Sequence, residues 1–171
     1  MARLYYETFA SPIGTLYCIT SESHLCYLQP VESTIHLKYL QQFQREMGEI
    51  CEKTTSLSLK LQYQLSEYFN QQRQTFSIPI QRIGTPFQKE VWQALTTIEY
   101  GQTISYKEMA QKVHRPKAYQ AVGTAIGKNP ILILQPCHRV ISLNGSIGGF
   151  SAGIERKTHL LTLESTSLRS D

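Results

Sequence analysis

The chain has 171 residues, of which 41% are hydrophobic and 18% are charged, and its formal net charge is +4 at pH 7. This length is enough for one ordinary domain or two small ones. No apolar run approaches the roughly 20 residues of a membrane-spanning helix, so we expect no membrane-embedded segment. The opening residues, MARLYYETFA, lack the apolar core of a secretory signal, which favours a cytoplasmic location.

The N-terminal part is predicted to form a small α/β domain. Stretches rich in β-branched and aromatic residues predict three short strands at 4–9, 14–20 and 24–29, separated by turn signals. Apolar residues recur at helical spacing over 37–47 and 57–69, which predicts two helices. The expected fold is a small antiparallel sheet covered by helices. Pro79 and Gly84 interrupt the pattern, and we place a boundary there, with domains at 1–81 and 82–171.

A helix is predicted to begin at Thr85. Thr85 and Gln88 have the spacing of a capping box, and Pro86 suits the first helical position. Apolar residues then follow at helical spacing, and Gly101 is expected to end the helix.

Two further short helices are predicted, at 105–113 and 117–127, and together the three indicate a helix-turn-helix. The last one, KAYQAVGTAIGK, is rich in small residues, which would allow either close approach to a nucleic-acid groove or close packing in a core. Residues 82–171 hold eleven Lys and Arg against six Asp and Glu, whereas 1–81 hold six against seven. That surplus suits a polyanion-binding surface, although it also serves solubility.

A cysteine follows the apolar run 131–134, which is predicted to be a buried strand, in the sequence Gln135-Pro136-Cys137-His138-Arg139-Val140. The His and Arg predict basic surroundings that lower the thiol pKa from its usual value of about 8.5, and a thiolate is a nucleophile. A Cys beside a His also arises by coincidence in packed cores. The Cys-His pair alone leaves both interpretations open.

The segments GTPFQKEVWQAL, GQTISYKEMA, RPKAYQAVGTAIGKNP, ILILQPCHRV and GSIGGFSAGIERKTHLL together resemble the active domain of the O6-alkylguanine-DNA alkyltransferase (methylated-DNA–protein-cysteine methyltransferase) family. The resemblance runs from Gly84 to Glu164, about half the chain. It implies a ribonuclease-H-like α/β N-terminal domain and a mainly α, winged helix-turn-helix C-terminal domain. It also implies a single-use DNA repair enzyme, a monomer without a cofactor, that moves an alkyl group irreversibly from O6 of guanine in double-stranded DNA to a cysteine. O4 of thymine is a further candidate position.

The resemblance assigns roles to five residues of the reaction. Cys137 would accept the alkyl group, His138 would take its proton through a water molecule, and Glu164 would orient His138. Asn129 would hold the turn beneath the sulfur. Tyr106 would hydrogen-bond the guanine ring and help to neutralise charge as the guanine leaves.

The resemblance also implies a guanine pocket and a surface that binds the DNA minor groove and flips the damaged base out of the stack. The pocket would contain Tyr106, Val140, Phe150, Ser151 and Ala152. The DNA-binding residues would come from the third helix and its flanks: Lys117, Ala118, Tyr119, Gln120, Ala121, Gly123 and Lys128.

Several positions depart from the family pattern, and three of them bear on the site. Gln120 stands where the family has an Arg that fills the space of the flipped nucleotide, so base flipping or DNA affinity should be weaker, unless Tyr119 compensates by stacking. Ala152 replaces a frequent Gly on the pocket loop, which predicts a preference for methyl over benzyl groups. Gln135 replaces an apolar residue before Pro136.

Two other functions remain as alternatives. A non-catalytic lesion sensor or DNA-binding regulator is favoured by Gln120 and disfavoured by the intact Cys137. A cysteine hydrolase is the third hypothesis, but no separate His and oxyanion-hole signature is present. Cys18, His24 and Cys26 lie close in sequence but lack a clean fourth ligand, so no metal is expected.

Overall fold

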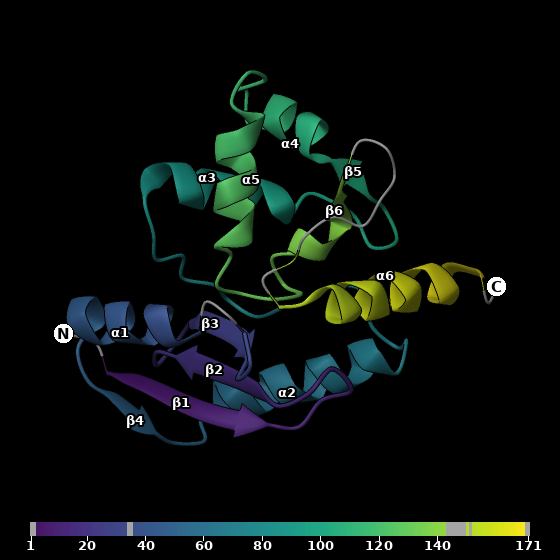
Figure 1. Cartoon of the computed structure of the whole chain (residues 1–171). Coiled ribbons are helices and arrows are strands. Elements are labelled where there is room, and N and C mark those ends of the chain that lie inside the picture. The colour runs from purple at the N-terminus through teal and green to yellow at the C-terminus, as the bar shows by residue number, and fades with distance from the viewer. Residues whose placement is uncertain (1–2, 34–35, 143–149, 151, 170–171) are drawn as a thin grey trace. The chain divides into compact units, whose positions relative to one another are not determined.

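The fold is that of a computed structural model, which describes residues 3–33, 36–142, 150 and 152–169. The chain divides into two compact units, residues 1–82 and 83–171 (Figure 1). Among the described residues, no helix combines the length and the apolar character that crossing a bilayer requires.

The first unit is built on a four-stranded sheet with the order β3-β2-β1-β4. Its strands are β1 (Leu4–Phe9), β2 (Leu16–Thr20), β3 (Leu25–Pro30) and β4 (Ile50–Glu52). The first three match the predicted strands and pair in antiparallel fashion. The small antiparallel sheet expected from the sequence is extended by β4, which pairs in parallel with β1. β4 is three residues long and has no buried residue, so it carries no alternating pattern that could reveal it.

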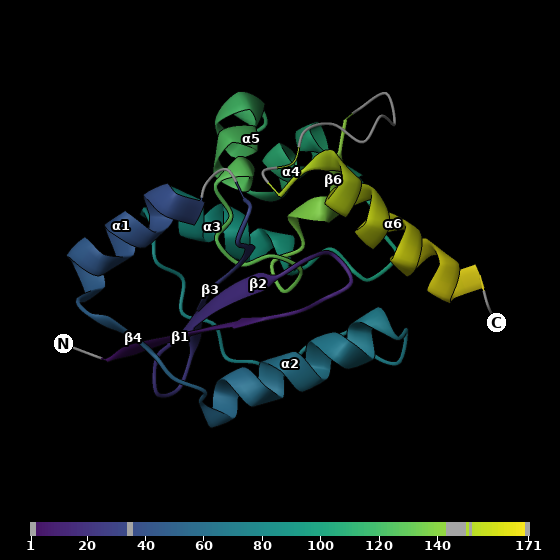
Figure 2. The ribbon, with the colours of Figure 1, turned by 60° about the horizontal axis from the view of Figure 1, so that its bottom comes forward.

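Two helices cover opposite faces of this sheet, and Figure 2 shows the sheet lying between them. On one face, the Tyr27 ring of β3 lies 5.9 Å from that of Phe43. On the other face, the Ser58 hydroxyl donates to Glu7 of β1 at 2.7 Å. In the sheet, Tyr27 of β3 pairs with Ile19 of β2, and Glu7 of β1 pairs with Cys18 of β2. Because successive residues of β2 point to opposite faces, Tyr27 and Glu7 lie on opposite faces of the sheet. The helices, both predicted, are α1 (His36–Met47) and α2 (Ser56–Phe69).

The second unit is mainly helical, with one two-stranded parallel sheet. Its elements are α3 (Pro86–Leu95), β5 (Ile104–Ser105), α4 (Tyr106–Lys112), α5 (Tyr119–Gly127), the short 3-10 helix η1 (Cys137–Arg139), β6 (Val140–Ile141) and α6 (Ile154–Arg169). Both predicted capping boxes are present, at Thr85 with Gln88 and at Ser105 with Glu108. The helices α3, α4 and α5 lie together in Figure 1, and α5 contacts both of the others.

The first of these helices ends earlier than predicted. It stops at Leu95 rather than at Gly101, and the hydroxyls of Thr96 and Thr97 each donate to a helix carbonyl at 2.6 Å. Such local side-chain hydrogen bonds compete with continuation of a helix. Gly101 then adopts a φ of 80° in the following turn, a left-handed conformation that glycine tolerates.

Trp92 of α3 organises the core of the second unit. Its side chain is fully buried, and Nε1 donates to the carbonyl of Ala125 in α5 at 2.8 Å. A Cβ on Gly84 would lie 2.7 Å from the Trp92 ring, so only glycine fits there without displacement. Cys137 and Val140 belong to the same buried cluster. The reactive-cysteine candidate therefore sits on a packed core rather than on a mobile loop.

Candidate functional site

The segment before Cys137 is a series of tight turns, not the predicted strand. Pro130 and Pro136 bracket it, and the Leu134 N–H donates to the Leu132 carbonyl at 2.7 Å. Ile133, between them, has a φ of 70°. A γ-turn of this hand is rare, and a β-branched residue at positive φ is strained by about 1–2 kcal/mol. The apolar run is buried as expected, but it is folded back on itself.

Asn129 holds this turn through a buried amide group. Its Nδ2 donates to the carbonyls of Ile131 at 3.2 Å and Gln135 at 2.8 Å. Its Oδ1 accepts from the Ile131 N–H at 3.1 Å and from the Gln135 side chain at 2.7 Å. One side chain thus joins both ends of the segment that leads into Cys137.

The Cys137 thiol is buried and protonated. Its residue is 4% exposed, and burial raises the pKa of the thiol to about 11, against smaller opposing effects of a hydrogen bond from Asn129 and the charge of Lys157. The expectation of a lowered pKa is therefore wrong for the protein alone. The sequence shows the basic neighbours of Cys137, but it does not show how completely the sulfur is removed from water.

His138 and Arg139 both bind one buried carboxylate, that of Glu164 in α6. His138 Nε2 lies 2.6 Å from Glu164 Oε2, and Arg139 donates to both carboxylate oxygens at 2.8 and 3.1 Å. Burial alone would raise the pKa of Glu164, but these two partners lower it to about 2. The predicted His138–Glu164 contact is present. The Arg139 side chain hydrogen-bonds to Glu164 rather than to the cysteine.

The other ring nitrogen of His138, Nδ1, is the one that can accept a proton. Burial lowers the pKa of His138 despite the Glu164 carboxylate, so the ring is neutral near pH 7. Within the described part of the chain, its Nδ1 is buried and has no hydrogen-bond partner. Because Nε2 carries the proton that faces Glu164, Nδ1 holds a lone pair that can accept a proton.

Lys157 is a buried cation at this site that the sequence did not reveal. Its Nζ donates to the Val140 carbonyl at 2.7 Å and lies 6.0 Å from the Tyr106 ring centre and 5.8 Å from that of Phe150. Burial lowers the pKa of Lys157, whereas the charge of a Cys137 thiolate raises it. Lys157, Leu160 and Glu164 are all buried at helical spacing on α6, and this periodicity was the one available signal.

Three of the expected pocket residues, Tyr106, Val140 and Phe150, lie around Lys157. Tyr106 is the first residue of α4 and is half-buried, Phe150 is half-buried against the core cluster, and Val140 is fully buried in β6. Ala152 is buried, with its carbonyl accepting from Arg156 at 2.9 Å. Ser151 lies outside the described residues.

The residues predicted to bind DNA fall mostly on the exposed side of α5. Tyr119 is 51% exposed. The other exposed members of this group are Lys117, Gln120, Ala121 and Lys128. Ala118, at the helix start, and Gly123 are half-buried, and a Cβ on Gly123 would lie 3.6 Å from the Tyr106 ring. Val122 and Ala125 pack into the core, so this side of the helix has the core-packing role considered above.

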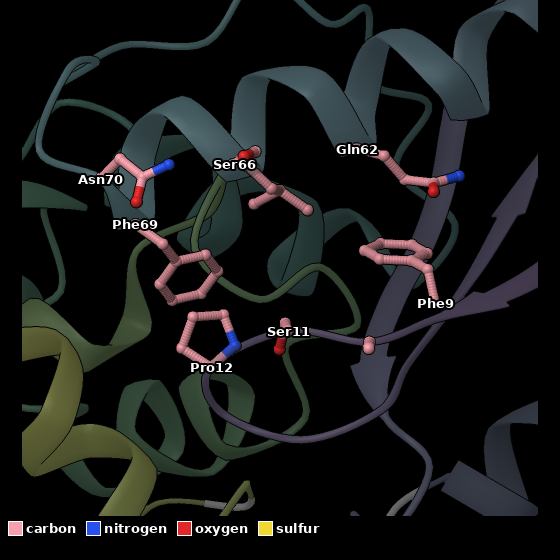
Figure 3. A pocket seen from close by; sticks show the side chains of 9 residues that line it. Phe9, Ser11, Pro12, Gln62, Ser66, Phe69 and Asn70 are labelled. Carbon is pink, nitrogen blue, oxygen red and sulfur yellow. The ribbon is translucent and has the colours of Figure 1, made fainter.

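The first unit contains a separate cavity of about 250 Å³ between the β1–β2 turn and α2. Figure 3 shows Phe9, Ser11 and Pro12 on the side of the β1–β2 turn, and Ser66 and Phe69 on the helix side. Its lining holds no ionisable group, so it offers no acid–base or thiol chemistry. Among the residues that the structure describes, no cluster of His, Cys, Asp or Glu could hold a metal ion.

Comparison with known proteins places both units in one family. Residues 4–81 match the ribonuclease-like domain of 6-O-methylguanine DNA methyltransferase, and residues 86–166 match its DNA-binding domain. The methylated-DNA–protein-cysteine methyltransferase of Methanosarcina barkeri is 37% identical over 97% of this chain and 100% of that protein. The Mycobacterium leprae protein of the same name is 40% identical over 94% of this chain and 92% of that protein.

A solved structure agrees with these matches. Mycobacterium tuberculosis OGT in complex with DNA superposes with a TM-score of 0.85 at 37% identity, over 95% of this chain and 94% of that one. Fold and site together define a two-domain protein with a cysteine, a histidine and a glutamate on a helix-turn-helix unit. The chain belongs to the methylated-DNA–protein-cysteine methyltransferase family, a family of enzymes, as the resemblance of its motifs implied.

Proposed function

We propose that this protein repairs double-stranded DNA by transferring an alkyl group from O6 of guanine to the Sγ atom of Cys137, once per molecule. The observation that carries the proposal is the buried network in which Cys137 precedes a neutral His138 held by Glu164. The turn around Asn129 places the sulfur on a rigid core. These are the nucleophile, base and orienting group of covalent catalysis.

The reaction begins with removal of the thiol proton. His138 Nδ1 accepts this proton through a water molecule, and Glu164 stabilises the resulting imidazolium through the 2.6 Å contact at Nε2. The sulfur attacks the alkyl carbon, the S–C bond forms as the C–O6 bond breaks, and the electron pair leaves on guanine. The thioether has no good leaving group, so the protein does not turn over.

Negative charge moves from sulfur to the departing guanine, and two groups are placed to stabilise it. The Tyr106 hydroxyl donates a hydrogen bond to the guanine ring. The leaving guanine takes up one proton, which balances the proton that Cys137 gave to His138. The Lys157 cation lies about 6 Å from the Tyr106 and Phe150 rings that would border the base. A fixed cation in a water-poor site stabilises charge more strongly than it would in water.

The damaged base must leave the helical stack to reach a sulfur that is 4% exposed. The exposed side of α5 would bind the minor groove, with Gln120 and Tyr119 beside the space that the base vacates. Backbone groups of Cys137 and Val140, together with Ser151, would read the base edges. Ala152 is buried, and its methyl group, in place of a glycine hydrogen, would narrow the pocket and favour methyl over benzyl groups.

Intact-mass measurement after incubation with a duplex containing O6-methylguanine tests the proposal. We expect a gain of one methyl group, located on the peptide that holds Cys137, at no more than one per molecule. The Cys137→Ala variant should bind the duplex and gain no mass. Loss of the lesion with an unmodified Cys137 would refute the proposal.

A lesion sensor on the same fold is the second candidate, and the uncharged Gln120 on exposed α5 favours it. In that case the duplex would be bound tightly while the protein mass stayed constant over hours. The same incubation therefore separates the two candidates.

A further inference from the structure

The side chain of Gln135 has no role in the function proposed above, yet it is fully buried beside the reactive cysteine. Its Nε2 donates to Asn129 Oδ1 at 2.7 Å. Burial of a polar side chain is unfavourable unless its hydrogen bonds are made. The hydrogen bond to Asn129 offsets part of the cost of burying the Gln135 amide. The backbone carbonyl of the same residue accepts from Asn129 Nδ2 at 2.8 Å. Gln135 therefore contacts both ends of the Asn129 amide.

We propose that Gln135 is a positioning residue, which fixes the orientation of the Asn129 amide so that its NH2 group, and not its oxygen, faces the Cys137 sulfur. The proposal rests on Cys137 being the nucleophile. An amide rotated by half a turn would present a lone pair to the thiolate and repel it. The donated hydrogen bond from Gln135 opposes that rotation, because a rotated Asn129 would place NH2 against NH2.

The local geometry makes this orientation consequential. A hydrogen bond from the Asn129 side chain favours the ionised form of Cys137. The backbone supports the same orientation, since the Ile131 N–H donates to Asn129 Oδ1 at 3.1 Å. Gln135 adds the shorter of the two hydrogen bonds to that oxygen. Its loss should weaken the stabilisation of the thiolate without abolishing it.

The test measures the rate of Cys137 alkylation by iodoacetamide as a function of pH, with no DNA present. The exposed Cys51 is replaced by Ser in every protein, and peptide mass spectrometry locates the label. Gln135→Met keeps the length of the side chain and removes the donor. We expect its pH profile to move upward by about half a unit to one unit, which lowers the rate near pH 8 about three- to tenfold.

Gln64→Met is the matched control. Gln64 is also a buried amide, and it exchanges hydrogen bonds with Ser77 at 2.8 and 3.0 Å in the first unit. Its loss should lower the melting temperature and leave the pH profile of Cys137 unchanged. A purely structural role for Gln135 would give the same pattern in Gln135→Met, and that result would overturn the proposal.

Gln135→Glu gives a second, independent measurement. A protonated Glu has the shape of Gln and donates to Asn129, whereas an ionised Glu only accepts, and burial raises the pKa of such a carboxyl. Its alkylation rate relative to the Gln135 protein should be near one at low pH and fall as the carboxyl ionises. A constant ratio in a folded variant would contradict the proposal. Neither measurement involves DNA, so failure of this proposal can be distinguished from failure of the proposed methyl transfer.

Discussion

Replacing the buried Lys157 with Met tests whether a cation stabilises the charge that develops in the reaction. Met has a similar length and no charge. The Nζ atom lies 6.0 Å from the Tyr106 ring centre. For a base that borders this ring we take a similar distance, about 6 Å. Two unit charges about 6 Å apart, at an effective dielectric constant of about 20, interact by about 3 kcal/mol. With about half of a unit charge formed in the transition state, the variant loses about 1.4 kcal/mol of transition-state stabilisation, which slows methyl transfer about tenfold.

The stability of this variant should fall by less than the full cost of one lost buried hydrogen bond. Val140 loses the donor to its carbonyl, which costs about 1–3 kcal/mol, while removal of a buried charge offsets part of that cost. The assay is single-turnover methyl transfer from an O6-methylguanine duplex, with thermal melting measured on the same samples. Lys60→Met, at an exposed position of α2, is the control and should match the unaltered protein. A Lys157→Met protein that transfers methyl within twofold of the unaltered rate would refute the electrostatic reasoning.

Four further outcomes are expected. Glu164→Gln removes a charge that buried partners require, so the free energy of unfolding should fall by about 3–5 kcal/mol in denaturant titration; an unchanged midpoint would contradict this. Because the pKa of His138 lies below its ordinary value of 6.5, methyl transfer should be constant from pH 8 down to 6.5 and decline only at lower pH, and a midpoint above 6.5 would exclude a neutral base. His114→Gly should stabilise the protein by about 1 kcal/mol, because this exposed residue has a φ of 60° after α4; a lower melting temperature would count against that strain. Gln120→Arg should tighten binding to undamaged duplex DNA and steepen its salt dependence, which fluorescence anisotropy at several salt concentrations would show or exclude.

Local signals in the sequence predicted most of the secondary structure. The capping boxes at Thr85 and Ser105 depend on residues three apart, and both are present. The strand β4 was not predicted, because the strand it pairs with, β1 at Leu4 to Tyr6, lies more than forty residues earlier in the chain. The apolar run before Cys137 was predicted as a strand because burial produces the same pattern in a strand and in a packed turn.

The candidate site was predicted in part. The pairing of His138 with Glu164 followed from the resemblance of the motifs, and the structure places the two side chains in contact. The direction in which the Cys137 pKa shifts was not predicted from the sequence. Burial raises this pKa by more than the neighbouring charges lower it. Lys157 and Gln135 were also missed as parts of the site. Their roles depend on contacts made across the fold, and no sequence spacing shows which groups they reach.

The burial of Cys137 bears on the proposed single use of this residue. A thiol that stays protonated, with a pKa of about 11, is a poor target for free electrophiles and for disulfide exchange. Cys18 and Cys26 are shielded in the same way, with pKa values of about 12 and 11, which leaves Cys51 as the exposed thiol among those described. Stray alkylating agents and oxidants would thus react first at the exposed Cys51. The acceptor would be spared for a base delivered into its pocket.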